Sequence, residues 1–156
     1  MFTIGCDRAT KIAASELLDP GAVLWLAAGW VRLELVHNAG AFMSLGEALP
    51  DAIRKPLLLG LVPLLVGAAS VLALRQSAAR LRFVLAAALL AGGGIANWLD
   101  RIAHHGLVTD FVSLGFGPIR TGIFNVADLA VVAGALLLFA GSRRAKARLP
   151  GDGPAT

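Results

Sequence analysis

Charged residues and cysteine are both scarce in this chain of 156 residues. Only 15% of the residues are charged, whereas in soluble domains the share is about a quarter. Cys6 is the single cysteine, which excludes a disulfide within one chain and a metal site built from cysteines. The first residues are not followed by the apolar stretch of a cleavable secretory signal. These features exclude an ordinary soluble domain and a disulfide-stabilised scaffold.

Hydrophobic residues, in contrast, make up 57% of the chain, and the mean hydropathy is +0.75. They are gathered into long blocks that are apolar on all sides, with the charges between the blocks. A helix that crosses the bilayer core needs about 20 apolar residues. We therefore expect one mostly α-helical, multi-pass membrane domain over residues 1–156, with full spans at about 57–74, 83–99 and 123–140. Pro63 lies inside the first span, where a neighbouring helix can satisfy the carbonyl that proline leaves free.

The positive charges lie at the ends of the predicted spans. The formal net charge is +4. The basic residues between the first two spans and after the third span are Arg75, Arg80, Arg82, Arg143, Arg144, Lys146 and Arg148. Basic residues next to a span mark its cytoplasmic side, which predicts a cytoplasmic tail at 142–156. Residues 19–55 and 104–122 then lie outside the cytoplasm. The basic clusters lack interleaved aromatic residues, which argues against nucleic acid as a partner.

Two further segments have a recognisable local pattern. Residues 30–36 (WVRLELV) alternate apolar and charged residues and lead into the turn-rich HNAGAF, which predicts a small extracytoplasmic β element around residues 30–45. Gly92–Gly94 lie within the second span, where small residues let helix backbones approach closely. That packing would also bring Asn97 toward a neighbouring helix.

Polar residues inside or at the rim of the spans are the candidates for function. They are Asn97, Asp100, Arg101, Asp110, Asn125 and Asp128. An ionisable group at the centre of a spanning helix costs about 2.5–3.5 kcal/mol on insertion scales. For Asp100 and Arg101 we favour a structural role, as opposite charges at a helix end that bridge to other elements. Asp128 has no basic residue in its own span, and its spacing from Asn125 predicts that both lie on one helix face.

Asp110 and Asp128 together indicate one chemistry. Two acids that approach closely cannot both ionise, so they share a proton and their titrations separate. The charged acid then takes a proton from water while the neutral acid donates one to a carbonyl oxygen. This is peptide hydrolysis by an aspartate pair, without a metal or cofactor. The residues alone do not establish that Asp110 and Asp128 are close in space.

Four stretches of the chain resemble the successive motifs of the signal peptidase II family. They are DRATK, HNAGAF, GGGIANWLDRIAHHGLVTDF and FNVADLAV, in that order. The resemblance implies that Asp110 and Asp128 are the catalytic pair. It further implies that the supporting or substrate-binding residues are Asp7, Asn38, Asn97, Asp100, Arg101 and Asn125, with no metal site. The implied substrates are prolipoproteins whose cysteine already carries diacylglycerol, cleaved just before that cysteine. The implied setting is the bacterial inner membrane, with the site toward its extracytoplasmic face and a monomer surrounded by lipid.

The N-terminus departs from the pattern of the family. Family members carry a full spanning helix whose outer end bears the aspartate that matches Asp7, but here only Met1–Cys6 (MFTIGC) precede it. We expect this fragment to be the outer end of a helix whose inner half is missing. Codons upstream of Met1 are then expected to encode further apolar residues.

Two alternatives stay open. A metal-dependent membrane transferase of the phospholipid-head-group type would need several acids on neighbouring turns to hold divalent cations. Asp100, Asp110 and Asp128 are instead spread over a helix end, a loop and another helix, which disfavours this alternative. A non-catalytic transporter or scaffold would use Asp128 as a proton relay or a packing device, but it leaves the combination of VTDF and FNVAD unexplained.

Overall fold

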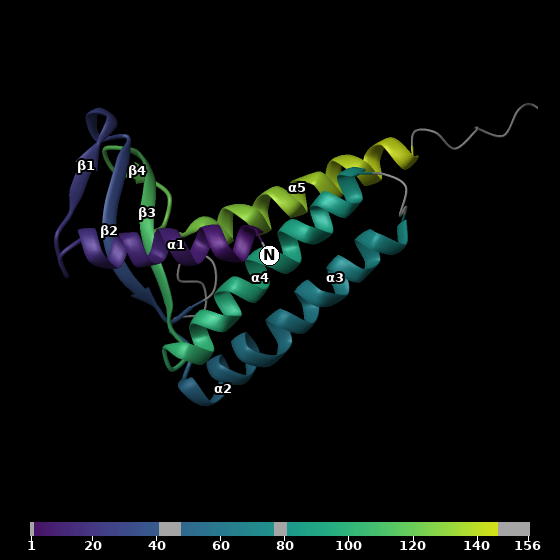
Figure 1. Ribbon diagram of the computed structural model, residues 1–156, viewed down its shortest axis with the longest axis horizontal. Coiled ribbons are helices and arrows are strands. Elements are labelled where there is room, and N and C mark those ends of the chain that lie inside the picture. Colours follow the sequence, from purple (N-terminus) through teal and green to yellow (C-terminus); the bar gives the residue numbers. More distant parts are fainter. Residues whose placement is uncertain (1, 41–47, 77–80, 147–156) are drawn as a thin grey trace, which may run out of the picture.

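The computed structural model describes residues 2–40, 48–76 and 81–146. The chain is mostly helical and carries a small antiparallel sheet at one end of its helices (Figure 1). Its elements are α1 (Phe2–Leu17), β1 (Leu24–Leu26), the short helix η1 (Ala27–Gly29), β2 (Val31–Asn38), α2 (Asp51–Pro56), η2 (Leu57–Leu61), α3 (Val62–Gln76), α4 (Leu81–Ala103), β3 (Val108–Phe116), β4 (Ile119–Arg120) and α5 (Val126–Lys146). Residues 41–45 of the predicted β element, Arg80, and Arg148 with the rest of the tail from 147 lie outside the described residues.

The apolar blocks of the sequence form the long helices. α2, η2 and α3 follow one another directly from Asp51 to Gln76, and α4 extends past the predicted end of its span to Ala103. Two described helical stretches are long and apolar enough to cross a membrane, Asp51–Leu72 and Leu81–Ala103. The apolar part of α5, Val126–Ala140, is shorter. The helical nature of the three predicted spans is therefore confirmed, while their number as full spans stays a prediction.

Pro63 is accommodated as the sequence predicted. In a regular α-helix the carbonyl of Leu59 would accept a bond from residue 63, but proline has no N–H group to donate. The chain forms a π-helical turn at Leu57–Leu61 just before this point. The indole Nε1 of Trp98 on α4 donates to the Leu59 carbonyl at 3.0 Å. A neighbouring helix thus satisfies the freed carbonyl and ties the first span to the second.

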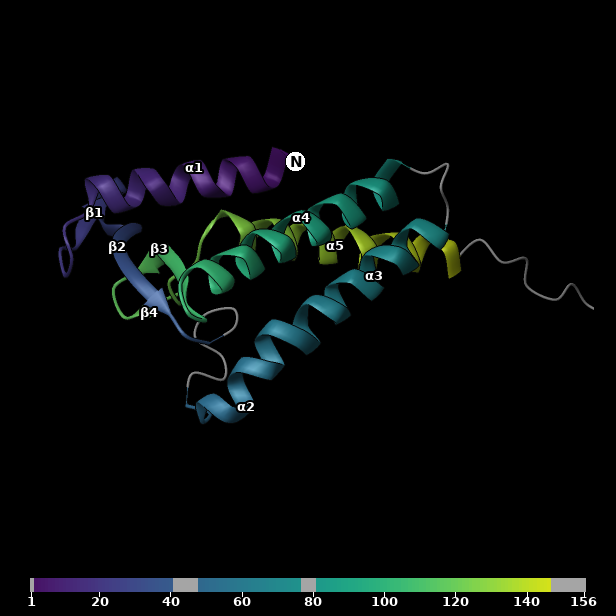
Figure 2. The ribbon, with the colours of Figure 1, turned by 60° about the horizontal axis from the view of Figure 1, so that its bottom comes forward.

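The glycine triplet of α4 lies where four helices meet. A Cβ atom added to Gly92 would clash with Thr3 of α1, one added to Gly93 with the Ala127 carbonyl of α5, and one added to Gly94 with Val66 of α3. α4 therefore lies between α1 and α3, as Figure 2 shows, and its glycines allow the close approach of all three neighbours. The predicted packing role of Gly92–Gly94 is confirmed.

The helix α1 extends further than the sequence suggested. Asp7, Lys11 and Ala14 are its buried residues, and their spacing of four and three places them on one helical face. The expectation that Asp7 marks the outer end of this helix is wrong, because α1 continues to Leu17. Two polar residues, Asp7 and Lys11, thus lie on the face with which α1 packs on the bundle.

The sheet is larger than the predicted β element. Its strands run in the order β1-β2-β3-β4, and all neighbours are antiparallel. β2 confirms the strand predicted from the alternation at residues 30–36. The expectation that Asp110 lies on a loop is wrong. The segment 107–122 contains the hairpin of β3 and β4, and β3, with two valines and two phenylalanines, pairs with β2. Asp110 therefore lies on a strand.

Candidate active site

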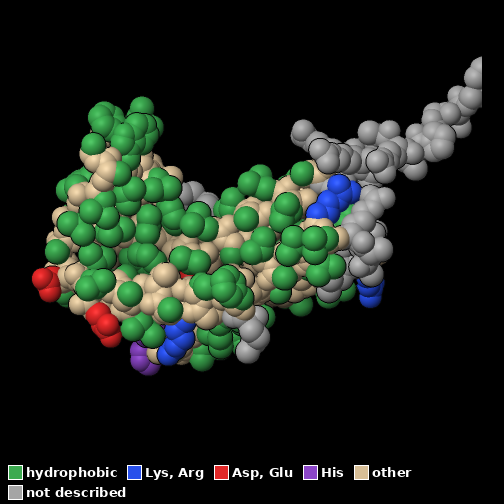
Figure 3. Space-filling view, turned by 45° about the horizontal axis from the view of Figure 1, so that its top comes forward, with side chains coloured by type: hydrophobic (Ala, Val, Ile, Leu, Met, Phe, Trp, Pro, Cys, Tyr) green, Lys and Arg blue, Asp and Glu red, His purple; other side chains and the backbone are tan. Residues whose placement is uncertain are grey.

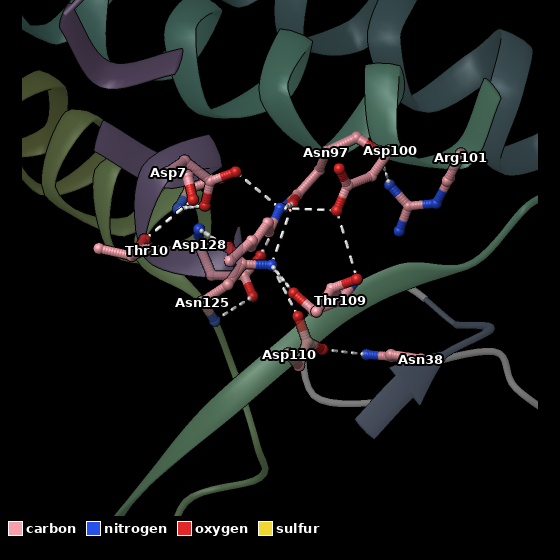
Figure 4. A network of polar contacts seen from close by, with 12 residues as sticks. Asp7, Thr10, Asn38, Asn97, Asp100, Arg101, Thr109, Asp110, Asn125 and Asp128 are labelled. Carbon is pink, nitrogen blue, oxygen red and sulfur yellow. Dashed lines mark hydrogen bonds and ion pairs between the residues drawn. The ribbon is translucent and has the colours of Figure 1, made fainter. Parts of the chain in front are cut away.

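A set of buried polar side chains lies where α1, the end of α4, β3 and the start of α5 meet (Figure 4). It contains every residue that the sequence singled out, together with two that it did not: Asp7, Lys11, Asn38, Asn97, Asp100, Arg101, Thr109, Asp110, Asn125 and Asp128. Each of these residues is at most 9% exposed. Buried polar groups are costly unless they are hydrogen-bonded, so the network between them is what makes this arrangement stable.

Asn125 and Asp128 form a reciprocal cap at the start of α5. The Asn125 side-chain oxygen accepts the backbone N–H of Asp128 at 2.9 Å, and the Asp128 carboxylate accepts the backbone N–H of Asn125 at 3.3 Å. This is the pattern of a capping box, in which two residues three apart satisfy each other's free N–H groups. The prediction that Asn125 lies inside the third span is wrong, since α5 begins at Val126. The spacing of three reflects the cap, which directs Asp128 into the network.

Asp110 faces the same asparagine from the sheet. The Nδ2 of Asn125 donates to Oδ1 of Asp110 at 2.6 Å, and the Nδ2 of Asn38 on β2 donates to its Oδ2 at 2.8 Å. Asn125 thus contacts both carboxylates, and the structure brings together the two acids that are 18 positions apart in the sequence. The pKa of Asp110 is raised to about 6, mainly by burial and in part by the charge of Asp128. The donors Asn38 and Asn125 act in the opposite direction.

Lys11 is one of the two residues of the network that the sequence reasoning missed, and it is the charged one. Its ammonium lies 2.6 Å from Asp7 and 2.9 Å from Asp100, and it donates to Oδ1 of Asn97 at 3.1 Å. Asp7 in turn accepts the backbone N–H of Ala127 at 2.8 Å, so it joins α1 to the first turn of α5. The spacing of four between Asp7 and Lys11 within DRATK could have indicated a pair on one helical face.

Asp100 and Arg101 point to different partners. Asp100 pairs with Lys11 and accepts the backbone N–H of Thr109 at 3.3 Å. Arg101 donates to the carbonyls of Asn97 at 3.2 Å and Gly40 at 2.9 Å. The predicted bridging of these charges to other elements is confirmed, because they connect α4 to α1, to β3 and to the residues that follow β2.

The three asparagine amides all present N–H groups to the aspartates. In each case a donor occupies the amide oxygen: the Gly40 N–H for Asn38, Lys11 and Asn125 for Asn97, and the Asp128 N–H for Asn125. The amide nitrogens are therefore left to donate, and Asn97 donates to Oδ1 of Asp128 at 2.9 Å. An amide has distinct donor and acceptor ends, so the network defines which end faces the carboxylates.

The donors in this site suit carboxylates rather than a cation. Within the described part of the chain, no group of three or more histidine, cysteine, aspartate or glutamate side chains is arranged to hold a metal ion. Asp7 and Asp100 take the ammonium of Lys11, while Asp110 and Asp128 take amide N–H groups. What the arrangement offers chemically is a pair of buried carboxylates held in position by neutral donors.

A protein-family model described as signal peptidase (SPase) II matches residues 1–143. The chain is 34% identical to the lipoprotein signal peptidase of Rhodococcus jostii (strain RHA1), over 86% of the chain and 65% of that protein. It is 37% identical to the lipoprotein signal peptidase of Gloeobacter violaceus, over 96% of the chain and 82% of that protein. The chain thus spans about two thirds of the Rhodococcus relative and a larger share of the Gloeobacter one.

Two solved structures share the fold. Both are described as bacterial membrane enzymes determined by the in meso method. The first aligns with a TM-score of 0.78 at 20% identity and covers 99% of this chain and 90% of its own. The second aligns with a TM-score of 0.71 at 22% identity and covers 90% of this chain and 87% of its own. The arrangement of helices and sheet is therefore that of known membrane enzymes.

Proposed function

Because the chain belongs to the signal peptidase II family, we propose that it is an aspartic endopeptidase of lipoprotein maturation. Its substrates are prolipoproteins that carry diacylglyceryl-cysteine, and the bond cleaved lies just before that cysteine. Asp110 and Asp128 are the catalytic pair. The observation that carries this assignment is that Asn125 contacts both carboxylates within one buried network.

The chemistry follows from two carboxylates that share one proton. The ionised acid accepts a proton from a water molecule, whose oxygen then attacks the carbonyl carbon of the scissile peptide bond. The neutral acid donates its proton to the carbonyl oxygen, so that the intermediate carries no full negative charge. When the carbon–nitrogen bond breaks, the leaving nitrogen takes a proton from the pair and the carbonyl forms again. The raised pKa of Asp110 favours a protonated member of the pair up to about pH 6.

The surrounding amides support this chemistry by holding both carboxylates in place. Each carboxylate of the pair accepts two N–H groups, one on each of its oxygens. A carboxylate held at both oxygens cannot turn away, and its remaining lone pairs stay available to the water and to the other acid. Asn38, Asn97 and Asn125 are therefore positioning residues. Pre-organised groups of this kind contribute to catalysis because they do not need to reorient during the reaction.

The charged supporting residues act one step further out. Lys11 forms ion pairs with Asp7 and Asp100 and donates to Asn97, so it stabilises the amide that holds Asp128. Asp7 holds the first turn of α5 through Ala127. Arg101 donates to Gly40, beside Asn38, and so supports the amide that holds Asp110. Each of these residues acts through one of the asparagines or through the cap of α5.

The proposed setting is the bacterial inner membrane, with three full spans at about 57–74, 83–99 and 123–140 and the chain as a monomer. Arg75 and Arg82 lie at the ends of α3 and α4 that point away from the sheet (Figure 1). The positive-inside rule puts that end in the cytoplasm. The polar network and the sheet then lie toward the extracytoplasmic face, where a translocated prolipoprotein arrives.

A cleavage assay tests the proposed function. The purified protein in detergent is given a prolipoprotein with diacylglycerol on its cysteine and, in parallel, the same prolipoprotein without it. We expect cleavage of the lipidated form only, unaffected by EDTA, with diacylglyceryl-cysteine as the new N-terminus. Loss of activity with EDTA that a divalent cation restores would contradict the aspartate-pair chemistry, and equal cleavage of both forms would contradict the substrate class.

A further inference from the structure

The two faces of the sheet differ in character. In the strand register, Arg32 on β2 lies opposite Trp25 on β1 and Ser113 on β3, so the three side chains share one face. The guanidinium of Arg32 lies 5.8 Å from the centre of the Trp25 ring, and that of Arg120 lies 4.9 Å from it. This face therefore carries two cations and a hydroxyl around a single indole, and we call it the arginine face.

The opposite face is apolar. Two cross-strand rows form it, Leu24–Leu33–Val112 and Leu26–Val31–Leu114. Leu33 and Val112 of the first row pack toward Ala14 and Leu18 at the end of α1. In the second row Leu26 is 44% exposed and Leu114 is 42% exposed. One part of the apolar face is thus covered by the protein, while the remaining part is open.

A hollow of about 740 Å³ extends the open part of the apolar face. The apolar side chains of Trp30, Leu114, Phe116 and Ile119 line it, together with Gly115, Arg120, Thr121 and Gly122. The rings of Trp30 and Phe116 lie 5.4 Å apart, and these side chains are 59% and 60% exposed, with Ile119 at 83%. An open patch of this kind is unfavourable in water and marks a contact with lipid or protein.

We infer that the apolar face, including its hollow, lies in the interfacial region of the lipid leaflet on the side of the sheet. Figure 3 shows hydrophobic side chains over the part of the molecule that holds the sheet and onward over the helices. In a membrane protein, lipid covers the apolar outer surface of the helices. Here that apolar surface continues from the helices onto the sheet. The two rows carry no charge. Arg120 lines the hollow and also contacts Trp25, so it lies between the hollow and the arginine face, which suits water and phosphate groups. Tryptophan is enriched at this depth of a membrane.

Contact of the sheet with lipid affects the position of the candidate site. Leu114 and Phe116 are on the same strand as Asp110, so a sheet anchored in the leaflet holds Asp110 at a fixed depth. A substrate whose lipidated cysteine lies at the membrane surface then presents its scissile bond at that depth. This consequence rests on the proposed function, but the contact between sheet and lipid does not.

The three tryptophans of the chain allow a direct test. Trp25 and Trp30 are similarly exposed, at 53% and 59%, but Trp25 belongs to the arginine face and Trp30 to the hollow. W25F/W98F leaves Trp30 as the only indole, and W30F/W98F leaves Trp25. Each variant is placed in vesicles of phosphatidylcholine brominated near the start of its acyl chains. We expect bromine to quench Trp30 more strongly than Trp25, and acrylamide in the water to quench Trp25 more strongly than Trp30.

The other outcomes overturn the inference. Equal or weaker quenching of Trp30 by bromine, with strong quenching by acrylamide, would place the hollow in water. Shielding of Trp30 from both quenchers, with the protein migrating as a dimer in detergent, would assign the face to a second copy of the chain. If Trp98→Phe disturbs folding, the single variants W25F and W30F give the same comparison by difference. None of these readouts depends on cleavage, so the result stands whether or not the proposed function does.

Discussion

The ammonium of Lys11 on α1 lies 2.9 Å from the carboxylate of Asp100 on α4, and both side chains are at most 10% exposed. Breaking a buried ion pair by removing one partner costs about 3–5 kcal/mol, because it leaves an uncompensated charge. Here Lys11 has a second carboxylate, Asp7, so its loss leaves two. The stability of the helix bundle and the geometry of the candidate site therefore depend on the same side chain.

Lys11→Met is expected to lower both stability and cleavage. The apparent unfolding temperature in detergent should fall, and the rate of cleavage should fall because Asn97 loses one of the donors that orient it. The matched control is Lys55→Met. Lys55 pairs with Asp51 at 3.0 Å, but its side chain is 49% exposed, and exposed pairs contribute about 0–1 kcal/mol. The double variant K11M/D100N should recover part of the lost stability; no recovery would show that the charge of Asp100 is not the cause.

Replacing either member of the proposed pair, Asp110→Asn or Asp128→Asn, should reduce cleavage to background. Asparagine keeps the shape of the side chain but cannot exchange a proton with water or a carbonyl at neutral pH. The amount of protein in membranes should stay near that of the unchanged chain. Asp51→Asn, at an exposed position of α2, is the control and should cleave normally. Near-normal activity of one variant would remove that residue from the catalytic assignment.

The raised pKa of Asp110 predicts a stability that depends on pH. The pKa is about 6 in the folded chain against an ordinary value of 3.8, so folding disfavours the ionised form. The free energy of unfolding is therefore not reduced by this group below about pH 4. It falls as the pH rises to about 6, by about 3 kcal/mol for a shift of this size. Unfolding temperatures of the unchanged chain and D110N, measured across this range, should diverge in favour of D110N as the pH rises. A constant difference would contradict the shift.

Gly93→Ala is expected to disturb the contact between α4 and α5. The added methyl group would meet the Ala127 carbonyl, and overpacking of this kind costs about 1–3 kcal/mol. It would also separate Asn97, one turn further along α4, from Asp128, the residue next to Ala127 on α5, so cleavage should fall more than the unfolding temperature alone suggests. Gly67→Ala is the control, since a Cβ atom there meets nothing within 4 Å. Equal effects of the two changes would contradict the packing role of Gly93.

The proposed topology is tested with a reporter enzyme that is active only outside the cytoplasm. Fused at Thr156, it should be inactive, because basic residues follow the last apolar block. Inserted near Ser113, it should be active, provided that the insertion leaves the helices in the membrane. The reverse pattern would put Asp110 on the wrong side for a translocated substrate.

The sequence by itself determined the class of the protein, the positions of the apolar helices and the identity of most polar residues of the site. Those features are local. A run of apolar residues is stable as a helix in lipid wherever it lies, and the polar residues in or next to such runs stand out because their neighbours are apolar. Asp7 and Asn38 were instead implied by the resemblance to the family. Even the accommodation of Pro63 followed from the missing N–H group, although the sequence did not name Trp98 as the partner.

Tertiary structure alone decided how the polar residues combine. In the sequence, Lys11 looks like an exposed residue of a helix. Only the packing of α4 against α1 shows that it pairs with Asp100. The strand that carries Asp110 became visible only through its pairing with β2, since a hairpin depends on partners distant in the chain. Asn125 had to precede α5, outside the helix, for its side chain to reach both Asp110 and Asp128. Contacts between distant segments depend on the approach of whole elements, and a linear pattern of residues does not specify that approach.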